Sequence, residues 1–188
     1  MHMKLLIYVG SPRKQGNTYK LLQYFTEQLN KYKVEYDVVK CKSSLTPCQH
    51  CGKCKIGYCA IKDEWYDYIK NFKSYDGVVF MSPIYFFQFT AQTKAFIDRL
   101  GGAGFEGWNN KILSCILTSG SEGYFGGKAL VVGSLRRTAK YHNCIYAGCY
   151  NKVTYDTITE VDDKDKSGIN LLLKRILRCY NEVNKKEQ

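Results

Sequence analysis

The sequence lacks long apolar runs and has few acidic residues for its size. No apolar stretch approaches the ~18 residues that a membrane-spanning helix needs, because the longest one, Gly77 to Phe89, is interrupted by Pro83. The apolar stretch Leu5 to Val9 is too short for the core of a signal peptide, and no cleavage site follows it. We therefore expect a soluble, cytoplasmic protein that does not associate with a membrane.

Acidic residues are scarcest in the first third of the chain. Residues 1–60 contain ten Lys or Arg and three Asp or Glu, which gives this stretch +7 of the total formal charge of +11. Such a surplus favours either a site for anionic ligands or a solvated basic surface. No basic stripe at helical spacing and no RNA- or DNA-binding motif accompanies it, so we expect no nucleic-acid partner.

Strand-like and helix-like patterns alternate along the chain, which favours an α/β fold. With 188 residues, 45% of them apolar, the chain is suited to a single domain over residues 1–188. Five strands separated by helices predict a three-layer, doubly wound parallel sheet. The expected strands are Lys4–Val9, Val34–Val39, Val78–Met81, Ile112–Leu117 and Cys144–Tyr150. The expected helices are Asn17–Lys31, Asp63–Phe72, Thr90–Leu100, Leu130–Ala139 and Ile169–Tyr180.

Two stretches break this alternation. Residues 41–62 form a Cys-rich insertion after the second expected strand, and residues 151–167 are polar and predicted to be irregular. Ligands of doubly wound sheets bind at the carboxyl ends of the strands. Three loops, at residues 10–17, 82–89 and 118–127, leave those ends and are the candidate ligand loops.

The first of these loops has the composition of a phosphate site. Residues 10–18 read GSPRKQGNT and run from a strand directly into a helix. The N-terminus of a helix attracts anions, an arginine can pair with phosphate oxygens, and glycines allow close approach. Asn17 or Thr18 is also suited to cap the helix. The loop is neither a Walker A loop nor a dinucleotide fingerprint, so a single phosphate fits best. The candidate phosphate residues are Ser11, Arg13, Lys14, Gly16, Asn17 and Thr18.

The other two loops are suited to a planar ligand. Residues 82–89 read SPIYFFQF, and four aromatic residues in five positions exceed what a core strand needs. Residues 119–127 read SGSEGYFGG, whose glycines permit backbone N–H groups to approach a ligand closely. The candidate residues are Pro83, Ile84, Tyr85 and Phe86 in one loop, and Ser119, Gly120, Ser121 and Tyr124 in the other. We expect Lys94, Asp98 and Arg99, on the helix that follows, to form a surface salt bridge.

Four of the nine cysteines lie close together in the insertion. Residues 47–59 read PCQHCGKCKIGYC, so that Cys48, Cys51, Cys54 and Cys59 are spaced x2, x2, x4. Zinc modules usually use two distant pairs, whereas three Cys in seven residues resemble a ferredoxin run. The pattern agrees with four alternatives: a [4Fe–4S] cluster, reduced thiols, a zinc site or a redox disulfide. Cys41 is an alternative fourth ligand. The remaining cysteines, Cys115, Cys144, Cys149 and Cys179, are expected to be buried core residues.

Together, residues 10–18 and 82–99 resemble the two signatures of the NAD(P)H-dependent FMN reductase group of the flavodoxin-like superfamily. The resemblance covers residues 4 to about 120. It implies bound FMN at the three loops, NAD(P)H as electron donor, and a homodimer or homotetramer. The Cys motif resembles that of iron–sulfur flavoproteins, which carry a [4Fe–4S] cluster between strand 2 and helix 2 and can exchange electrons with ferredoxin. The final x4 spacing departs from that family, where x5 or slightly longer is usual.

Three functions agree with these features. The first is an FMN-dependent oxidoreductase, in which FMN carries the redox chemistry and no side chain is required as a catalytic group. The second is a non-enzymatic electron carrier like flavodoxin, and the third is a zinc-stabilised binding module that uses the same fold.

Overall fold

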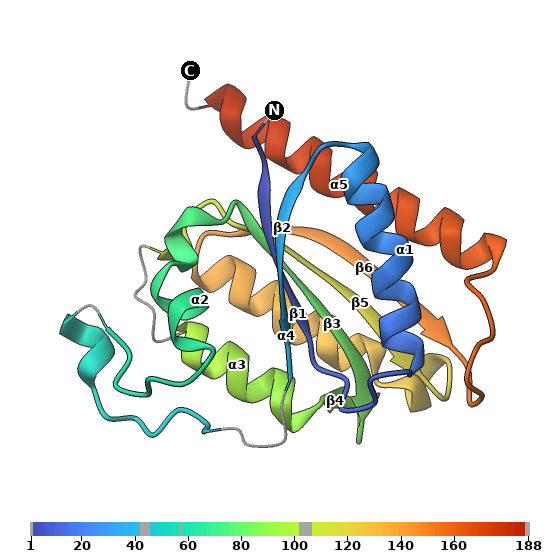
Figure 1. The fold of residues 1–188 in the computed structure, drawn as a ribbon, viewed down its shortest axis with the longest axis horizontal. Helices are drawn as coiled ribbons and strands as arrows, with labels where there is room; N and C mark the ends of the chain where they lie inside the picture. Colours follow the sequence, from blue (N-terminus) through green and yellow to red (C-terminus); the bar gives the residue numbers. More distant parts are fainter. Residues whose placement is uncertain (1, 42–45, 57, 102–106, 187–188) are drawn as a thin grey trace.

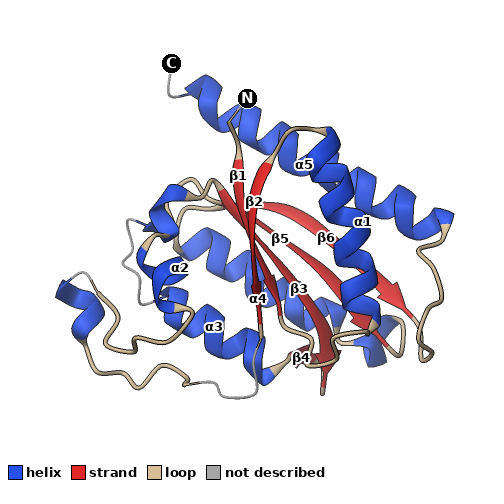
Figure 2. Cartoon of the chain, in the orientation of Figure 1, coloured by secondary structure: helices blue, strands red, loops and turns tan. Residues whose placement is uncertain are grey.

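A parallel sheet lies between two layers of helices (Figures 1 and 2). The computed structural model describes residues 2–41, 46–56, 58–101 and 107–186. The strands are β1 (Lys4–Val9), β2 (Glu35–Lys40), β3 (Gly77–Tyr85), β4 (Gln88–Phe89), β5 (Ile112–Ser119) and β6 (Ile145–Val153). The parallel strands follow the order β2-β1-β3-β5-β6, which is the flavodoxin-like order. The prediction of five parallel strands is confirmed.

The helices divide between the two faces of the sheet. The longer ones are α1 (Asn17–Lys31), α3 (Ala91–Gly101), α4 (Lys128–Tyr141) and α5 (Asp163–Lys186), and α2 (Tyr66–Lys70) is a short one. The described residues also form the 3₁₀ turns η1 (Lys53–Ile56), η2 (Phe72–Ser74) and η4 (Gly123–Gly126). Helices α1 and α5 cover one face, and α2, α3 and α4 cover the other (Figure 2). In the described part of the chain, no helix is both long and apolar enough to cross a membrane.

The central strands are apolar on both sides, and this gives the protein two cores. Successive side chains of a strand point to opposite faces. Leu5 and Ile7 of β1 therefore pack in the core beneath α1 and α5, whereas Leu6 and Tyr8 pack in the core beneath α2, α3 and α4. In that second core the ring of Tyr8 stacks on Phe96 of α3, with 4.2 Å between the ring centroids. The alternation explains why β1 reads as one continuous apolar run.

Several expected boundaries were wrong. Strand β3 continues to Tyr85 and turns back into β4, which pairs with it antiparallel, and the sequence pattern gave no sign of this short hairpin. The expected helix over residues 63–72 is shorter, because only Tyr66–Lys70 is α-helical before the 3₁₀ turn η2. Of the cysteines expected in the core, Cys115 is fully buried, whereas Cys144, Cys149 and Cys179 are half-buried.

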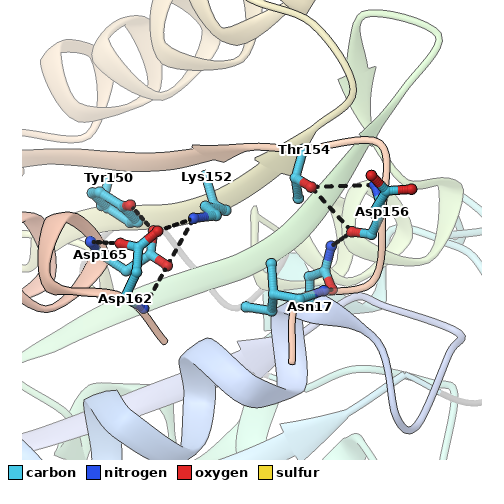
Figure 3. Close-up of polar contacts among 8 residues, drawn as sticks. Asn17, Tyr150, Lys152, Thr154, Asp156, Asp162 and Asp165 are labelled. Atoms are coloured by element: carbon cyan, nitrogen blue, oxygen red, sulfur yellow. Dashed lines mark hydrogen bonds and ion pairs between the residues drawn. The ribbon is translucent and has the colours of Figure 1, made fainter. Parts of the chain in front are cut away.

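The charged run at residues 162–166 was expected to be irregular, but most of it is the first turn of α5. Asp162 and Asp165 form a reciprocal capping pair: Asp165 N donates to Asp162 Oδ1 (2.7 Å), and Asp162 N donates to Asp165 Oδ2 (3.2 Å). Asp165 is fully buried, and Lys152 Nζ lies 3.0 Å from its carboxylate (Figure 3). Helix α5 thus begins six residues before its apolar stripe because polar contacts, not periodicity, set its start.

The expectation that Arg99 takes part in a helix-surface salt bridge was also wrong, although the exposed Lys94–Asp98 pair is present at 2.6 Å. The Arg99 side chain is buried (1% exposed) and pairs with Asp63. It also donates to the backbone carbonyls of Ile61 (3.1 Å) and Thr46 (3.5 Å). Burial by itself lowers the pKa of Arg99, but the hydrogen bond and charge of Asp63 raise it above its ordinary value. Arg99 therefore joins α3 to both sides of the Cys-rich insertion.

We predict that Asp63→Asn lowers the free energy of unfolding by about 3 kcal/mol, since it leaves a buried guanidinium without its counter-charge. The matched change Asp98→Asn removes the exposed partner of Lys94 on the same helix. It should cost less than about 0.5 kcal/mol. Urea denaturation of both variants checks the prediction, and equal losses would contradict it.

Candidate functional site

Four segments of the chain enclose a cleft at the carboxyl ends of β1, β3, β5 and β6. This is the edge where the strand order reverses between β1 and β3. The cleft is lined by Ser11, Arg13, Gly16, Asn17, Thr18, Pro83, Ile84, Tyr85, Thr118, Ser119, Gly120, Thr154, Tyr155, Asp156 and Thr157. Ten of the fourteen residues proposed from the sequence are among them. Lys14, Phe86, Ser121 and Tyr124 lie outside the lining.

The loop between β1 and α1 forms one end of the cleft. Its two hydroxyl residues are buried: Ser11 is 4% exposed and Thr18 is 1% exposed. Thr18 Oγ1 lies 3.3 Å from Thr118 Oγ1, within hydrogen-bond distance, so the loop is tied to the end of β5. Arg13 is exposed at the rim. The N-terminus of α1, with Gly16, Asn17 and Thr18, lines this end of the cleft, and a helix N-terminus suits an anion.

The expected capping of α1 by Asn17 or Thr18 was wrong, because Gly16 is the N-cap and makes no side-chain cap bond. Asn17 instead uses its amide elsewhere (Figure 3). Its Nδ2 donates to Asp156 O (2.9 Å), and its Oδ1 accepts from Ile158 N (2.9 Å). Both polar atoms of the Asn17 amide therefore contact the loop between β6 and α5.

The hairpin of β3 and β4 forms a second side of the cleft. Pro83, Ile84 and Tyr85 line it, whereas Phe86 at the tip of the hairpin is 96% exposed. Phe86 and Phe87 have φ angles of 49° and 67°. Non-glycine residues rarely adopt positive φ, and consecutive aromatic residues there carry backbone strain of a kind that often accompanies function. The tight turn re-aims the aromatic side chains, so Tyr85 faces the cleft and Phe86 faces solvent.

A buried cluster of hydroxyl groups fastens this hairpin to the phosphate-type loop. Thr90 Oγ1 donates to Gly10 O (2.8 Å) and lies 2.8 Å from Thr93 Oγ1. Thr93 Oγ1 in turn donates to Ser82 Oγ (3.1 Å). A Cβ atom on Gly10 would lie 1.8 Å from Thr93 Oγ1, so only glycine fits there. A packed polar junction therefore joins the ends of β1 and β3 to the start of α3.

The loop after β5 forms the third side. Ser119 and Gly120 line the cleft, and Ser119 Oγ donates to Ser121 O (3.0 Å). Ser121 Oγ lies 2.6 Å from Tyr155 Oη, within hydrogen-bond distance. Tyr124, which the sequence placed in the site, is 90% exposed. The beginning of this loop thus faces the cleft, and its aromatic part faces solvent.

Sequence reasoning missed five lining residues. Thr118 lies at the carboxyl end of β5, which extends two residues beyond the expected strand. Residues 154–157 belong to the stretch that was treated as irregular, and they reach the cleft only because the loop between β6 and α5 folds back over it. Position at the carboxyl end of β6 is the sequence signal that could have identified them.

The cleft has the donor set of a flavin mononucleotide site. Buried hydroxyls and a helix N-terminus at one end suit a phosphate, and a proline–aromatic turn opposite a glycine-containing loop suits a planar ring. The residues present therefore fit FMN. Asp156 is the one acidic residue among those that line the cleft.

In the described part of the Cys-rich insertion, residues 41, 46–56 and 58–62, the structure shows no assembled metal site. Cys48 and Cys51 are exposed, and Cys54 and Cys59 are half-buried. No group of three or more His, Cys, Asp or Glu side chains in the described ranges lies close enough to hold a metal ion. Cys41, the reserve ligand, donates through Sγ to Ser11 O (3.0 Å), and burial raises its pKa. As arranged, these thiols do not fit a four-thiolate cluster.

Comparison with known proteins agrees with the geometry of the cleft. The sequence profile of NADPH-dependent FMN reductases matches residues 3–151. The chain belongs to this family. Its relatives include an iron–sulfur flavoprotein of Methanocaldococcus jannaschii, 29% identical over 78% of this chain and 76% of the relative. An iron–sulfur flavoprotein of Archaeoglobus fulgidus is 32% identical over 63% of this chain, and the match spans only 60% of that relative.

Solved structures show the same fold for this FMN reductase family member. The apo form of an NADH:FMN oxidoreductase, EmoB, has a TM-score of 0.67, with 94% of this chain and 89% of that chain covered. At 16% identity this likeness is one of fold alone. Family and fold together make the chain a flavodoxin-like protein of an FMN-dependent oxidoreductase family.

We predict that Gly10→Ala destabilises the protein by about 1–3 kcal/mol, because the added methyl group must displace the Thr93 hydroxyl. Removing that hydroxyl with Thr93→Ala should reduce the further cost of Gly10→Ala. Denaturation of the two single variants and the double variant measures this coupling, and strictly additive losses would contradict it. Gly101→Ala is the matched control, since a Cβ there meets nothing within 4 Å.

Proposed function

We propose that the protein is an FMN-dependent oxidoreductase that takes electrons from NAD(P)H and passes them through bound FMN to an acceptor. The observation that carries this proposal is the cleft, in which a phosphate-type loop, a proline–aromatic turn and a glycine-containing loop meet at one edge of the sheet. The family match over residues 3–151 supports the same cofactor and electron donor.

The proposed roles follow from position in the cleft. The phosphate group would be held by the first turn of α1 and the loop before it, with Ser11, Arg13, Gly16 and Thr18 as contacts and Lys14 at its rim. The ring would lie between the turn Pro83–Phe86 and residues Ser119–Ser121, with Tyr124 beside them. FMN supplies the redox chemistry when it is bound. The chain itself binds, orients and partly shields the ring, and we assign no side chain a catalytic proton.

The proposal extends to the Cys motif and to assembly. The spacing of Cys48, Cys51, Cys54 and Cys59, and two relatives named iron–sulfur flavoproteins, support a [4Fe–4S] cluster in the loaded protein. Because these thiols are not gathered in the structure, we route no electron-transfer step through a cluster. Exposed aromatic side chains beside the cleft, among them Phe86 and Phe125, support a homodimer or homotetramer.

We expect Arg13→Ala to weaken FMN binding by about 10- to 100-fold, because a charge-assisted hydrogen bond is worth roughly 1.5–3 kcal/mol. Riboflavin, which has no phosphate, should bind to Arg13→Ala almost as tightly as it binds to the unaltered protein. Fluorescence titration measures both dissociation constants. Arg178→Ala, which removes an exposed arginine of α5, is the matched control and should change neither dissociation constant. If Arg13→Ala weakened the binding of both flavins equally, Arg13 would not be a phosphate contact.

Purification without oxygen tests cofactors and donor together. We expect a flavin spectrum that NADH or NADPH bleaches, together with iron and sulfide. Cys51→Ser should abolish the cluster absorbance and leave FMN bound. A colourless protein would overturn the flavin assignment, and a flavin spectrum without iron or sulfide would overturn the cluster. A flavin that neither nucleotide reduces would favour an electron carrier.

A further inference from the structure

A fourth wall of the cleft comes from a segment that the three-loop flavin site does not include. Residues 154–157, which follow β6, line the cleft beside Asn17 at one end and Gly120 at the other. This wall therefore runs from the phosphate-type loop to the loop after β5. The position of a surface loop depends on the contacts that hold it. Three sets of contacts hold this one.

The first set of contacts comes from the side-chain amide of Asn17. Its Nδ2 donates to Asp156 O (Figure 3), and its Oδ1 accepts from Ile158 N. Both distances are 2.9 Å, and the two bonds together mimic the pairing of a neighbouring strand. One turn further along α1, Lys20 Nζ donates to Ile158 O and to Thr159 O. The first two turns of α1 thus hold Asp156 of the wall and the two residues that follow the wall, Ile158 and Thr159.

The second is Tyr155, which rests against the loop after β5. A Cβ atom on Gly120 would lie 2.9 Å from Tyr155 Cε1, so the ring covers the Gly120 backbone. Its hydroxyl lies 2.6 Å from Ser121 Oγ. Tyr155 is 84% exposed, so its position depends on these contacts and not on burial in the core.

The third is the polar cluster that fixes the two ends of the loop. Thr154 N donates to Ser119 O (2.8 Å), which continues the pairing of β5 and β6. At the other end, Lys152 Nζ lies 2.7 Å from Asp162 and 3.0 Å from the buried carboxylate of Asp165. The hydroxyl of Tyr150 also donates to Asp165 (Figure 3). The loop is therefore anchored where it leaves the sheet and where it enters α5.

We propose that residues 154–157 are part of the flavin site, and that Asn17 and Tyr155 are positioning residues that hold this wall in place. The inference rests on the proposed function. It assigns Asn17 the role of holding the wall, since each polar atom of its amide already makes a hydrogen bond to this loop. Asn17 therefore influences the binding of a flavin whether or not the flavin carries a phosphate.

The dissociation constants of FMN and riboflavin, measured side by side, test this assignment. Asn17→Ala should weaken both flavins by the same factor, about 10-fold, which is ~1.4 kcal/mol. Arg13→Ala should weaken FMN selectively. If Asn17→Ala weakened the binding of FMN but not of riboflavin, the inference would be overturned, and Asn17 would be a phosphate contact. Asn30→Ala, the same change at the far end of α1, is the matched control.

A second measurement needs no flavin. Hydrogen–deuterium exchange of the ligand-free protein should be faster over residues 154–161 in Asn17→Ala and unchanged in Asn30→Ala. Tyr155→Phe removes the hydroxyl contact with Ser121 and keeps the ring, so it should raise both dissociation constants less than Tyr155→Ala does. Unchanged exchange over the wall, or no effect of Tyr155→Ala on either flavin, would overturn the inference alone. Failure of the unaltered protein to bind FMN would overturn the proposed function with it.

Discussion

The burial of both faces of the parallel sheet is the constraint on which the rest of the structure depends. Strand β1 pairs with β2 on one side and β3 on the other, and its side chains enter two different cores. Polar groups that meet a ligand can then emerge only where strands end. Because the chain order reverses between β1 and β3, the loops that follow these strands diverge to opposite faces and leave a cleft between them. The site is thus a consequence of the strand order.

Buried polar contacts turn this cleft into a defined site. The hydroxyl cluster around Thr90 and Thr93 joins the backbone of Gly10 to the hairpin that carries Tyr85. Arg99 follows Thr93 on α3 and joins this helix to the Cys-rich insertion through Asp63 and two backbone carbonyls. Helix α3 therefore contacts both the flavin-type loops and the insertion.

Much of the fold was predictable because it follows from local periodicity. The apolar run of β1 and the stripe of α1 have the expected bounds, and the five parallel strands are confirmed. The start of α5 was missed because it is set by Asp162, Asp165 and their contacts with β6, which no apolar pattern reports. Arg99 was misplaced for a similar reason. From the sequence alone, a charged residue in a helix is expected to be exposed, because its partner lies far away in the chain.

The sequence by itself determined the α/β class, the family and two of the loops that line the cleft, because strand–helix alternation and the residues of loops 10–18 and 82–89 are local features. Only the tertiary structure decided which side chains face the cleft and which serve other segments. Asn17 reads as a phosphate ligand beside Arg13, yet its amide pairs with residues about 140 positions away. Such pairings depend on where α5 and β6 pack, and that packing is the sum of contacts spread over the whole chain.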